Sequence, residues 1–223
     1  MPPRARCPRC QRPSLRCYCA QLPTASLHNH WPVTILQHPQ ESRHALGTAR
    51  IAQRGLRDCR LILGHAETLQ ADLAGLVASE RVALIYPGAD SQPLSVLREQ
   101  PPQRLLFIDA TWRKSRRLLL ESAWLAELPR YHLESPPPSR YRIRKEPHSE
   151  ALSTLEAIVH ALTFLEGTAE GFAGSDENKY SPLLQIMDGL IDEQIRAMGT
   201  ETFAKNYQPL QQREDCSDAT AQQ

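Results

Sequence analysis

Several common signatures are missing from this 223-residue sequence. No G-x-G-x-x-G follows the first apolar run and no G-x-x-x-x-G-K-[ST] occurs anywhere, which disfavours a standard dinucleotide-binding fold and a P-loop. A G-x-S-x-G motif is also absent, and with it the main signature of a serine hydrolase. No apolar run approaches the roughly 20 residues that span a bilayer. The usual motifs of nucleotide-binding, esterase and membrane proteins therefore do not explain this chain.

Charge of one sign is also missing from part of the chain. The first 40 residues contain no Asp or Glu, whereas from Glu166 onward acidic residues outnumber Lys and Arg by 11 to 4. A basic start and an acidic end predict a directed charged surface, although plain solvation explains the same charges equally well. The arginine-rich start lacks the apolar core of a secretory signal. We therefore expect a cytoplasmic protein with no membrane association and no obligate protein partner.

Cysteine is concentrated in the stretch CPRCQRPSLRCYC, residues 7–19, with the spacing C-x2-C-x6-C-x-C. In a cytoplasmic chain such clustering favours a metal over disulfides, and four thiolates suit tetrahedral zinc. The alternatives are two adventitious disulfides or unliganded thiols. We predict a structural zinc site, because four cysteines leave no open coordination position for catalysis. The predicted ligands of this small head, residues 1–25, are Cys7, Cys10, Cys17 and Cys19; the arginines between them are available to phosphates.

Continuous apolar runs alternate with helical patterns in the rest of the chain. Strands are expected at residues 33–37, 59–63, 80–88 and 103–109, with a fifth at 130–135. Helices are expected at residues 42–56, capped by Ser42, and at 111–128, 151–167 and 181–198, the last capped by Ser181. This alternation predicts an α/β domain over residues 30–212, with a parallel sheet flanked by helices. The polar residues 213–223 are expected to form a disordered tail.

Polar and aromatic residues stand where three of these strands end: Gln37-His38-Pro39, Tyr86-Pro87-Gly88 and Asp109-Ala110-Thr111-Trp112. Parallel sheets bind ligands beyond the carboxyl ends of their strands, so these segments are expected to converge on one crevice. Asp109 is either the N-cap of the next helix or a carboxylate that takes a proton from a substrate. Thr111 hydrogen-bonds the loop or a ligand. Trp112 is either a core residue or a plate on which a base stacks.

Basic residues follow these candidates in two segments. The helix after Asp109 carries Arg113, Lys114, Arg116 and Arg117, and a later loop carries Arg140, Arg142, Arg144 and Lys145. Two basic segments beside a basic head suit a polyanion such as RNA. Ser153, Thr154 and Glu156 begin the helix at 151–167. They either satisfy its first-turn amides or help to enclose a small ligand.

Five short motifs of the chain resemble the DTW-domain family. DATW, residues 109–112, is its Asp-x-Thr-Trp signature, and QHPQESRHALGTARIA and IYPG are similar to its His-Pro segment and Tyr-Pro-Gly turn. YRIRKEPHSEALSTLEAI is similar to its Arg-rich loop and Ser-Thr-x-Glu-Ala helix, and the four-cysteine head resembles that of bacterial members. Each motif is short, but five of them in the right order over residues 7 to about 200 are specific.

The resemblance implies a tRNA-modifying enzyme. Members of the family include tRNA-uridine aminocarboxypropyltransferases, which move the 3-amino-3-carboxypropyl group of S-adenosylmethionine to N3 of a uridine and release 5′-methylthioadenosine. For the bacterial type, that uridine lies in the variable loop of tRNA. The resemblance also implies a fold related to the SPOUT methyltransferases, with a C-terminal trefoil knot. The implied reaction needs a base for the N3 proton, and Asp109 is the only acid at the end of a predicted strand. The resemblance assigns the donor to Gln37, His38, Pro39, Tyr86, Pro87, Gly88, Thr111, Trp112, Ser153 and Thr154, and Glu156, at the start of the same helix, is added to this predicted donor site.

Rival functions are consistent with the same residues. An RNA methyltransferase of the related fold releases S-adenosylhomocysteine instead, and an aminocarboxypropyltransferase acting on ribosomal RNA shares the chemistry. A non-catalytic, zinc-dependent RNA-binding protein explains the charges but leaves the placement of Asp109 without a use. Arg142 and Arg144 meet either the donor carboxylate or an RNA phosphate, and the sequence does not decide between them.

Overall fold

A computed structural model describes residues 5–44, 46–143, 151–167 and 179–207. The predicted RNA contacts Arg144 and Lys145 and the predicted tail at 213–223 lie outside these residues. Within them, no helix is both long enough and apolar enough to cross a bilayer.

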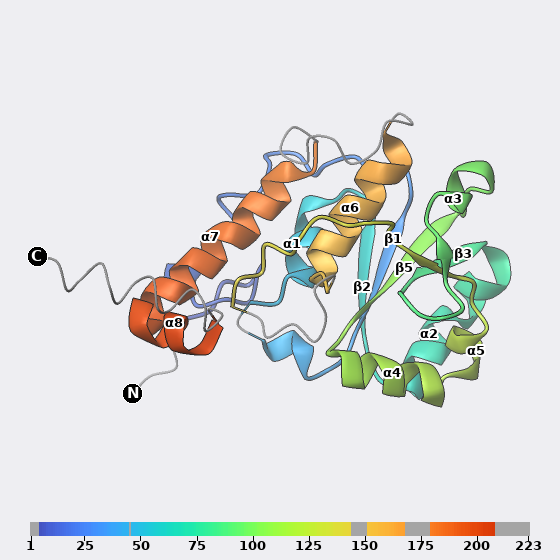
Figure 1. Ribbon diagram of the computed structural model, residues 1–223, viewed down its shortest axis with the longest axis horizontal. Helices are drawn as coiled ribbons and strands as arrows, with labels where there is room; N and C mark the ends of the chain where they lie inside the picture. The colour runs from blue at the N-terminus through green and yellow to red at the C-terminus, as the bar shows by residue number, and fades with distance from the viewer. Residues whose placement is uncertain (1–4, 45, 144–150, 168–178, 208–223) are drawn as a thin grey trace, which may run out of the picture.

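A six-stranded sheet forms the centre of the molecule (Figure 1). Its strands are β1 (Val33–Gln37), β2 (Cys59–Leu63), β3 (Val82–Ile85), β4 (Gln92–Pro93), β5 (Arg104–Asp109) and β6 (Arg130–His132). Their order is β2-β1-β5-β3-β6-β4, and every neighbouring pair is parallel. All five residues of β1 are buried, as expected for a strand covered on both faces. The predicted α/β class with a parallel sheet flanked by helices is confirmed.

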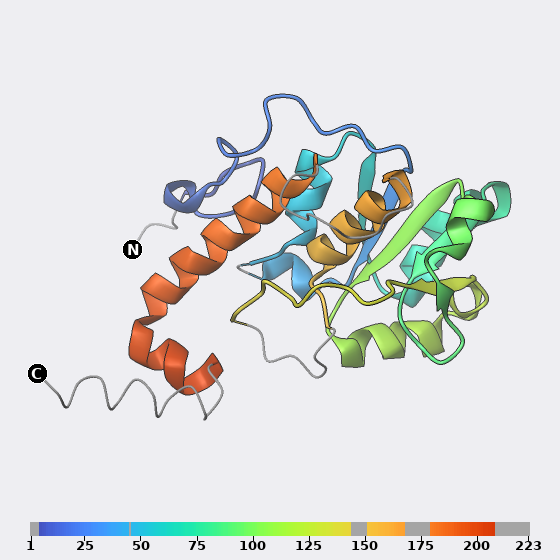
Figure 2. The same cartoon turned by 45° about the horizontal axis from the view of Figure 1, so that its top comes forward.

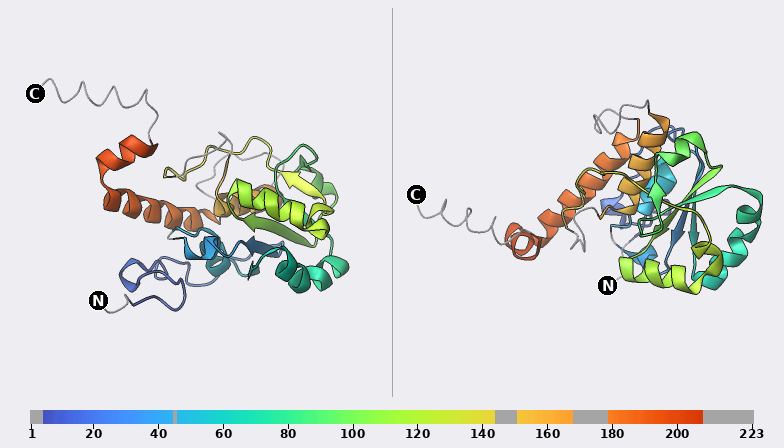
Figure 3. Two further views of the ribbon diagram at one scale, coloured as in Figure 1. Left: turned by 90° about the horizontal axis from the view of Figure 1, so that it is seen from below. Right: turned by 45° about the vertical axis from the view of Figure 1, so that its right-hand side comes forward.

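Helices cover both faces of this sheet (Figures 1 and 3). One layer contains α1 (Ala49–Gly55), α6 (Thr154–Glu166) and α7 (Ser181–Met198); the other contains α2 (Ala66–Ser79), α4 (Trp112–Glu121) and α5 (Ala123–Ala126). Successive strand side chains point to opposite faces, so Ile35 packs in the first core and Leu36 in the second. The short helices η1 (Ser14–Arg16), η2 (Glu41–Arg43), α3 (Val96–Glu99) and α8 (Thr200–Tyr207) complete the described elements.

Several expected helix boundaries are wrong. The helix expected at 42–56 is the shorter α1, and Ser42 lies in η2, where its hydroxyl donates to the Pro39 carbonyl oxygen instead of capping a helix. The helix expected at 111–128 is interrupted at Ser122, a buried residue with φ −123° and ψ 89°. Tyr180, rather than Ser181, occupies the N-cap position of α7, and Pro182 lies in its first turn as expected. Helices α2, α3 and α8 and strand β4 were not predicted from the sequence.

The cysteine-rich head packs against α7 (Figure 2). Its Cys10 and Tyr18 are buried in the same core as α6 and α7. Glu193 of α7 pairs with both Arg12 and Arg16, at nitrogen–oxygen distances of 3.1 and 3.2 Å. Part of the basic charge of the head is therefore neutralised within the molecule by the acidic C-terminal region.

Candidate functional site

Asp109 lies at the carboxyl end of β5, where two other segments hold its side chain. Gln37 is its register partner on β1 and donates from Nε2 to Asp109 Oδ2 at 2.7 Å. Thr154, at the start of α6, donates from Oγ1 to Oδ1 at 2.6 Å. Thr111, not Asp109, occupies the N-cap position of α4. The carboxylate is thus held by neighbours on both of its oxygens, and capping a helix does not explain its position.

Cavity 1, of about 400 Å³, opens between the ends of β3, β5 and β6 and the start of α6. Its wall is mostly apolar and includes Ile85, Phe107, Leu133 and Leu152. The wall residues that the structure describes include no Asp, Glu, Lys or Arg. Volume and lining match a site for a small, largely uncharged ligand with a flat apolar face.

Cavity 2, of about 650 Å³, adjoins cavity 1 and shares four wall residues with it: Ala110, Trp112, Ser153 and Thr154. Its wall differs in carrying charge, because Asp109, Arg113 and Glu41 all line it. Tyr207 of α8 lies on the same wall, so the C-terminal part of the chain contributes to this cavity. The two cavities meet beside Asp109.

The Tyr-Pro-Gly and Thr-Trp segments meet at these cavities, as the convergence of strand ends predicted. Tyr86, Pro87 and Gly88 line cavity 1, while Trp112 lies in the shared wall. The Tyr86 hydroxyl is 3.0 Å from Ser115 Oγ on α4, and the Tyr86 and Trp112 rings are 5.7 Å apart. This contact fixes the aromatic part of the shared wall.

The first three residues of the His-Pro segment, Gln37, His38 and Pro39, line neither cavity, whereas its later part lines cavity 2 through Glu41, His44, Leu46, Gly47 and Thr48. Gln37 is 1% exposed and reaches the site only through Asp109. The His38 ring packs edge-on against His65, with 5.1 Å between ring centroids. Burial and then the nearby charge of Lys114 lower the pKa of His38. The contacts of His38 in the structure are thus with the protein. Contacts of His38 and Pro39 with the donor remain a prediction.

Glu156 is fully buried and holds the loop at residues 139–141 by hydrogen bonds. Its carboxylate accepts hydrogen bonds from the Ser153 amide in a capping box, and from the Ser139 hydroxyl and the Arg140 amide. It does not line either cavity. Tyr141, in the loop that it anchors, does line cavity 2. The structure therefore gives Glu156 a positioning contact, and its predicted contact with the donor is untested.

The predicted RNA-binding residues fall into two groups. On α4, Arg113 and Arg116 are exposed, whereas Lys114 pairs with Glu41 at 2.6 Å and Arg117 with Glu121 at 2.6 Å. In the loop, Arg140 pairs with Asp188 at 2.5 Å and Arg142 with Asp192, both acids on α7. An RNA phosphate that contacts the loop has to compete with these acids, so α4 presents the more available basic face.

Some wall residues were not predicted from the sequence. Ser91 and His132 line cavity 1, and His44, Gln194 and Tyr207 line cavity 2. The expected strand at 130–135 was the one available signal, because its carboxyl end belongs to the same sheet edge. His44 lies in the motif at residues 37–52, after β1, and Ser91 lies in the loop between β3 and β4. Gln194 and Tyr207 have no local pattern and reach the site through the packing of α7 and α8.

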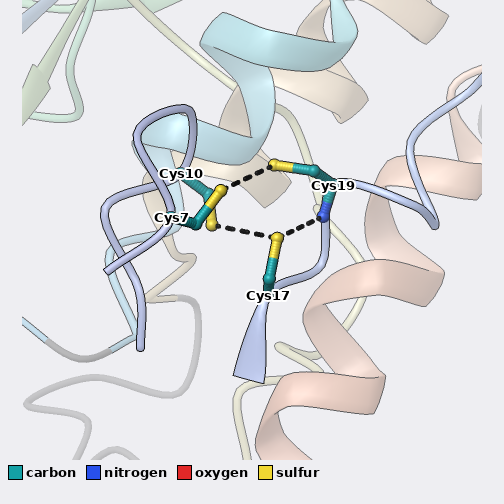
Figure 4. A group of neighbouring side chains, drawn as sticks. All are labelled: Cys7, Cys10, Cys17 and Cys19. Carbon is teal, nitrogen blue, oxygen red and sulfur yellow. Dashed lines mark hydrogen bonds between the residues drawn. The ribbon is translucent and has the colours of Figure 1, made fainter. Parts of the chain in front are cut away.

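The four predicted metal ligands lie together in the head (Figure 4). Their sulfur atoms are all within 4.8 Å of one another; Cys7 and Cys19 are 3.8 Å apart, and Cys10 and Cys17 are 3.7 Å apart. The first pair lies in a tight turn that the Gln11 amide closes by donating to the Cys7 carbonyl oxygen at 2.9 Å, and Gln11 itself has φ 62°. Hydrogen bonds from the Cys10 and Arg9 backbone lower the pKa of Cys7 to about 6. The cluster can hold a metal ion.

The chain is similar to a group of RNA-modifying enzymes. The DTW domain profile matches residues 4–195. The tRNA-uridine aminocarboxypropyltransferase 2 of Drosophila melanogaster is 33% identical over 173 residues, which cover 75% of this chain and 69% of that protein. The tRNA-uridine aminocarboxypropyltransferase A of Arabidopsis thaliana is 26% identical over 247 residues, covering 94% and 91%. The tRNA-uridine aminocarboxypropyltransferase 2 of Mus musculus is 31% identical over 171 residues, covering 73% and 57%. No solved structure matches the chain.

Proposed function

The chain belongs to the DTW domain family, and we propose that it transfers the 3-amino-3-carboxypropyl group of S-adenosylmethionine to N3 of a uridine in tRNA, releasing 5′-methylthioadenosine. The names of its animal and plant relatives support this reaction class. The likeness of the head to bacterial members supports a uridine in the variable loop and a cytoplasmic enzyme. The parallel sheet with the order β2-β1-β5-β3-β6-β4 is consistent with a SPOUT-related fold, for which we also propose the C-terminal knot.

The division of charge between the two cavities supports a particular pose of the donor. The adenosine part is uncharged and has a flat apolar face, which suits cavity 1. The amino-acid arm carries an ammonium and a carboxylate, and burying either in an uncharged wall is costly. The arm therefore extends past Trp112 and Thr154 into cavity 2, toward Asp109 and Arg113.

The position of Asp109 at the junction of the cavities is the observation that carries the proposal. N3 of uridine holds an imide proton and is a poor nucleophile until that proton leaves. Asp109 accepts the proton, the N3 lone pair forms a bond to the arm carbon, and the carbon–sulfur bond breaks with its electrons going to sulfur. The sulfonium becomes the neutral sulfur of 5′-methylthioadenosine. Because positive charge disappears at sulfur, alignment contributes more than electrostatic clamping.

The four thiolates fit a structural zinc ion. A tetrahedron with zinc–sulfur bonds of about 2.3 Å has edges of about 3.8 Å, and the two shortest sulfur contacts are 3.7 and 3.8 Å. When bound, the ion cross-links the two cysteine pairs. The proposed contacts for tRNA phosphates are then the arginines on this head and the exposed Arg113 and Arg116 on α4. The other basic residues can bind phosphate only when they break their ion pairs with acidic side chains; they are Lys114, Arg117, Arg140 and Arg142.

The products of the reaction test the proposal. Purified protein is incubated with S-adenosylmethionine and bulk unmodified tRNA, and small molecules and nucleosides are separated by mass. We expect 5′-methylthioadenosine together with a uridine heavier by one aminocarboxypropyl group. The Asp109→Asn protein is the matched control and is expected to form both products at least about 100-fold more slowly. S-adenosylhomocysteine with a methylated nucleoside would mean that the donor binds in the methyl-transfer pose.

A further inference from the structure

Cavity 1 contains one imidazole among its described wall residues, that of His132 at the end of β6. The ring is held by Ser91, which lies on the same wall, with 2.9 Å between Ser91 Oγ and His132 Nδ1. Neither residue takes part in the proton transfer proposed above. An imidazole that is fixed on one nitrogen, in a mostly apolar wall, leaves its other nitrogen for a ligand.

The hydrogen bonds around Ser91 favour a proton on Nδ1 of this ring. Ser91 Oγ accepts from the Gly88 amide at 3.1 Å and donates to the Gly88 carbonyl oxygen at 2.7 Å. A hydroxyl has one proton, so once it donates to Gly88 the contact with His132 requires that Nδ1 carry the proton. In the neutral ring Nε2 is then a hydrogen-bond acceptor.

We propose that His132 is a specificity residue that recognises the 6-amino group of the donor's adenine through an Nε2 acceptor fixed by Ser91. This inference rests on the proposed function, in which cavity 1 takes the adenosine part of the donor. The turn at Gly88–Ser91 and the end of β6 would then form the polar edge of an otherwise apolar base site.

The chemistry of the donor selects the adenine. Its ammonium is also a hydrogen-bond donor, but it is charged, and the described wall of cavity 1 offers no carboxylate to it. The base combines a flat face, which suits Phe107 and Leu133, with an edge that carries an N–H donor. A purine with a 6-oxo group places an acceptor opposite Nε2, so the two lone pairs face each other and the hydrogen bond is lost.

Binding of two product analogues tests this inference without requiring catalysis. The dissociation constants of 5′-methylthioadenosine and 5′-methylthioinosine are measured by calorimetry with the full-length, zinc-loaded protein. We expect the wild type to prefer the 6-amino compound by about 10- to 100-fold, the range for a lost hydrogen bond with an unsatisfied acceptor. His132→Phe keeps an aromatic ring without the acceptor, and the preference should fall below about threefold.

A second variant keeps the inference testable if His132→Phe does not fold. Ser91→Ala removes the contact that fixes the proton on Nδ1, so the ring can present an N–H from Nε2. We expect this variant to bind the 6-oxo compound more tightly than the wild type does, and a structural role alone does not predict such a gain. His28→Phe, at an exposed histidine away from cavity 1, is the matched control and should keep the wild-type preference.

The outcomes separate the two proposals. Equal affinity of the wild type for both compounds overturns the role of His132, as does an unchanged preference in His132→Phe and Ser91→Ala. In either case binding of 5′-methylthioadenosine still supports the proposed function. If the wild type binds none of 5′-methylthioadenosine, 5′-methylthioinosine and S-adenosylmethionine, the proposed function is overturned, and the inference with it.

Discussion

Cavity 1 and cavity 2 share Trp112 and Thr154 but differ in charge. The described wall of cavity 1 carries no charged side chain, whereas Asp109, Arg113 and Glu41 line cavity 2. A donor with an uncharged nucleoside and a zwitterionic arm has one favourable orientation across this boundary. In the proposed pose, this difference in charge places the arm, and not the methyl group, beside Asp109, and it accounts for the choice of the arm carbon.

Asp109→Asn should have the largest effect, and it should lower the rate of transfer while leaving nucleoside affinity almost unchanged. The amide cannot accept the imide proton, so we expect the rate of transfer to tRNA to fall by about 10²- to 10⁴-fold. The affinity for 5′-methylthioadenosine should stay within about threefold, because we propose that this compound binds in cavity 1, whose described wall does not include Asp109. Single-turnover kinetics and calorimetry check the two halves. A variant that kept near-normal turnover would remove Asp109 from the role of base.

Thr154→Val is expected to disturb the alignment of the Asp109 carboxylate. It keeps the shape of the shared wall but removes the hydroxyl that donates to Asp109 at 2.6 Å. Hydrogen bonds to charged groups contribute about 1.5–3 kcal/mol, which corresponds to a loss of roughly 10- to 100-fold in kcat if the bond persists in the transition state. Gln37→Leu removes the other donor to Asp109 and should behave in the same way. A large loss of nucleoside binding with unchanged kcat would instead mean that Thr154 acts on the donor alone and not through Asp109.

Cys17→Ser, in the cysteine-rich head, should affect cavity 2 more than cavity 1. Loss of the metal ligand is expected to release zinc, which atomic absorption measures, and to loosen the contact between Glu193 and the head. Gln194 and Met198 follow Glu193 on α7 and line cavity 2 but not cavity 1. We therefore expect kcat/KM for tRNA to fall by about tenfold, or ~1.4 kcal/mol, with a smaller change in 5′-methylthioadenosine binding. Equal losses would indicate that the head supports the whole fold and does not act on the RNA side.

Arg113→Ala should have the smallest effect. Arg113 is exposed on the rim of cavity 2, where it can meet an RNA phosphate or the donor carboxylate. If it meets a phosphate, the KM for tRNA rises a few-fold and the slope of log affinity against log salt falls by about 1. Glu127→Ala, at an exposed position beyond α5, is a control away from both cavities. A rise in the dissociation constant of S-adenosylmethionine alone would assign Arg113 to the donor.

The sequence predicted the parts of this site that depend on strand ends. The apolar runs ending at Gln37, Ile85 and Asp109 become neighbours in a parallel sheet, so the segments after them converge without any long-range information. The cysteine spacing similarly predicted the cluster in the head. These features are local, and the rule that joins them is general.

Other parts depend on packing that no local pattern records. The short β4 is an exposed edge strand of two residues that includes a proline, which is a poor strand signal. The break at Ser122 interrupts an otherwise continuous helical pattern. Glu156 was predicted to contact the donor; its hydrogen bonds to the loop at Ser139 and Arg140 depend on tertiary packing and were not predicted. The acids of α7 were read as a separate acidic end, whereas they pair with the basic loop and head.

A crystal structure with S-adenosylmethionine bound tests the division of the two cavities most directly. The measurement is the distance from the Asp109 carboxylate to the arm carbon attached to sulfur, compared with its distance to the methyl carbon. We predict adenine in cavity 1 beside His132, with the arm carbon facing Asp109 and the methyl turned away. Adenine in cavity 2, or a methyl group facing Asp109, would contradict the account.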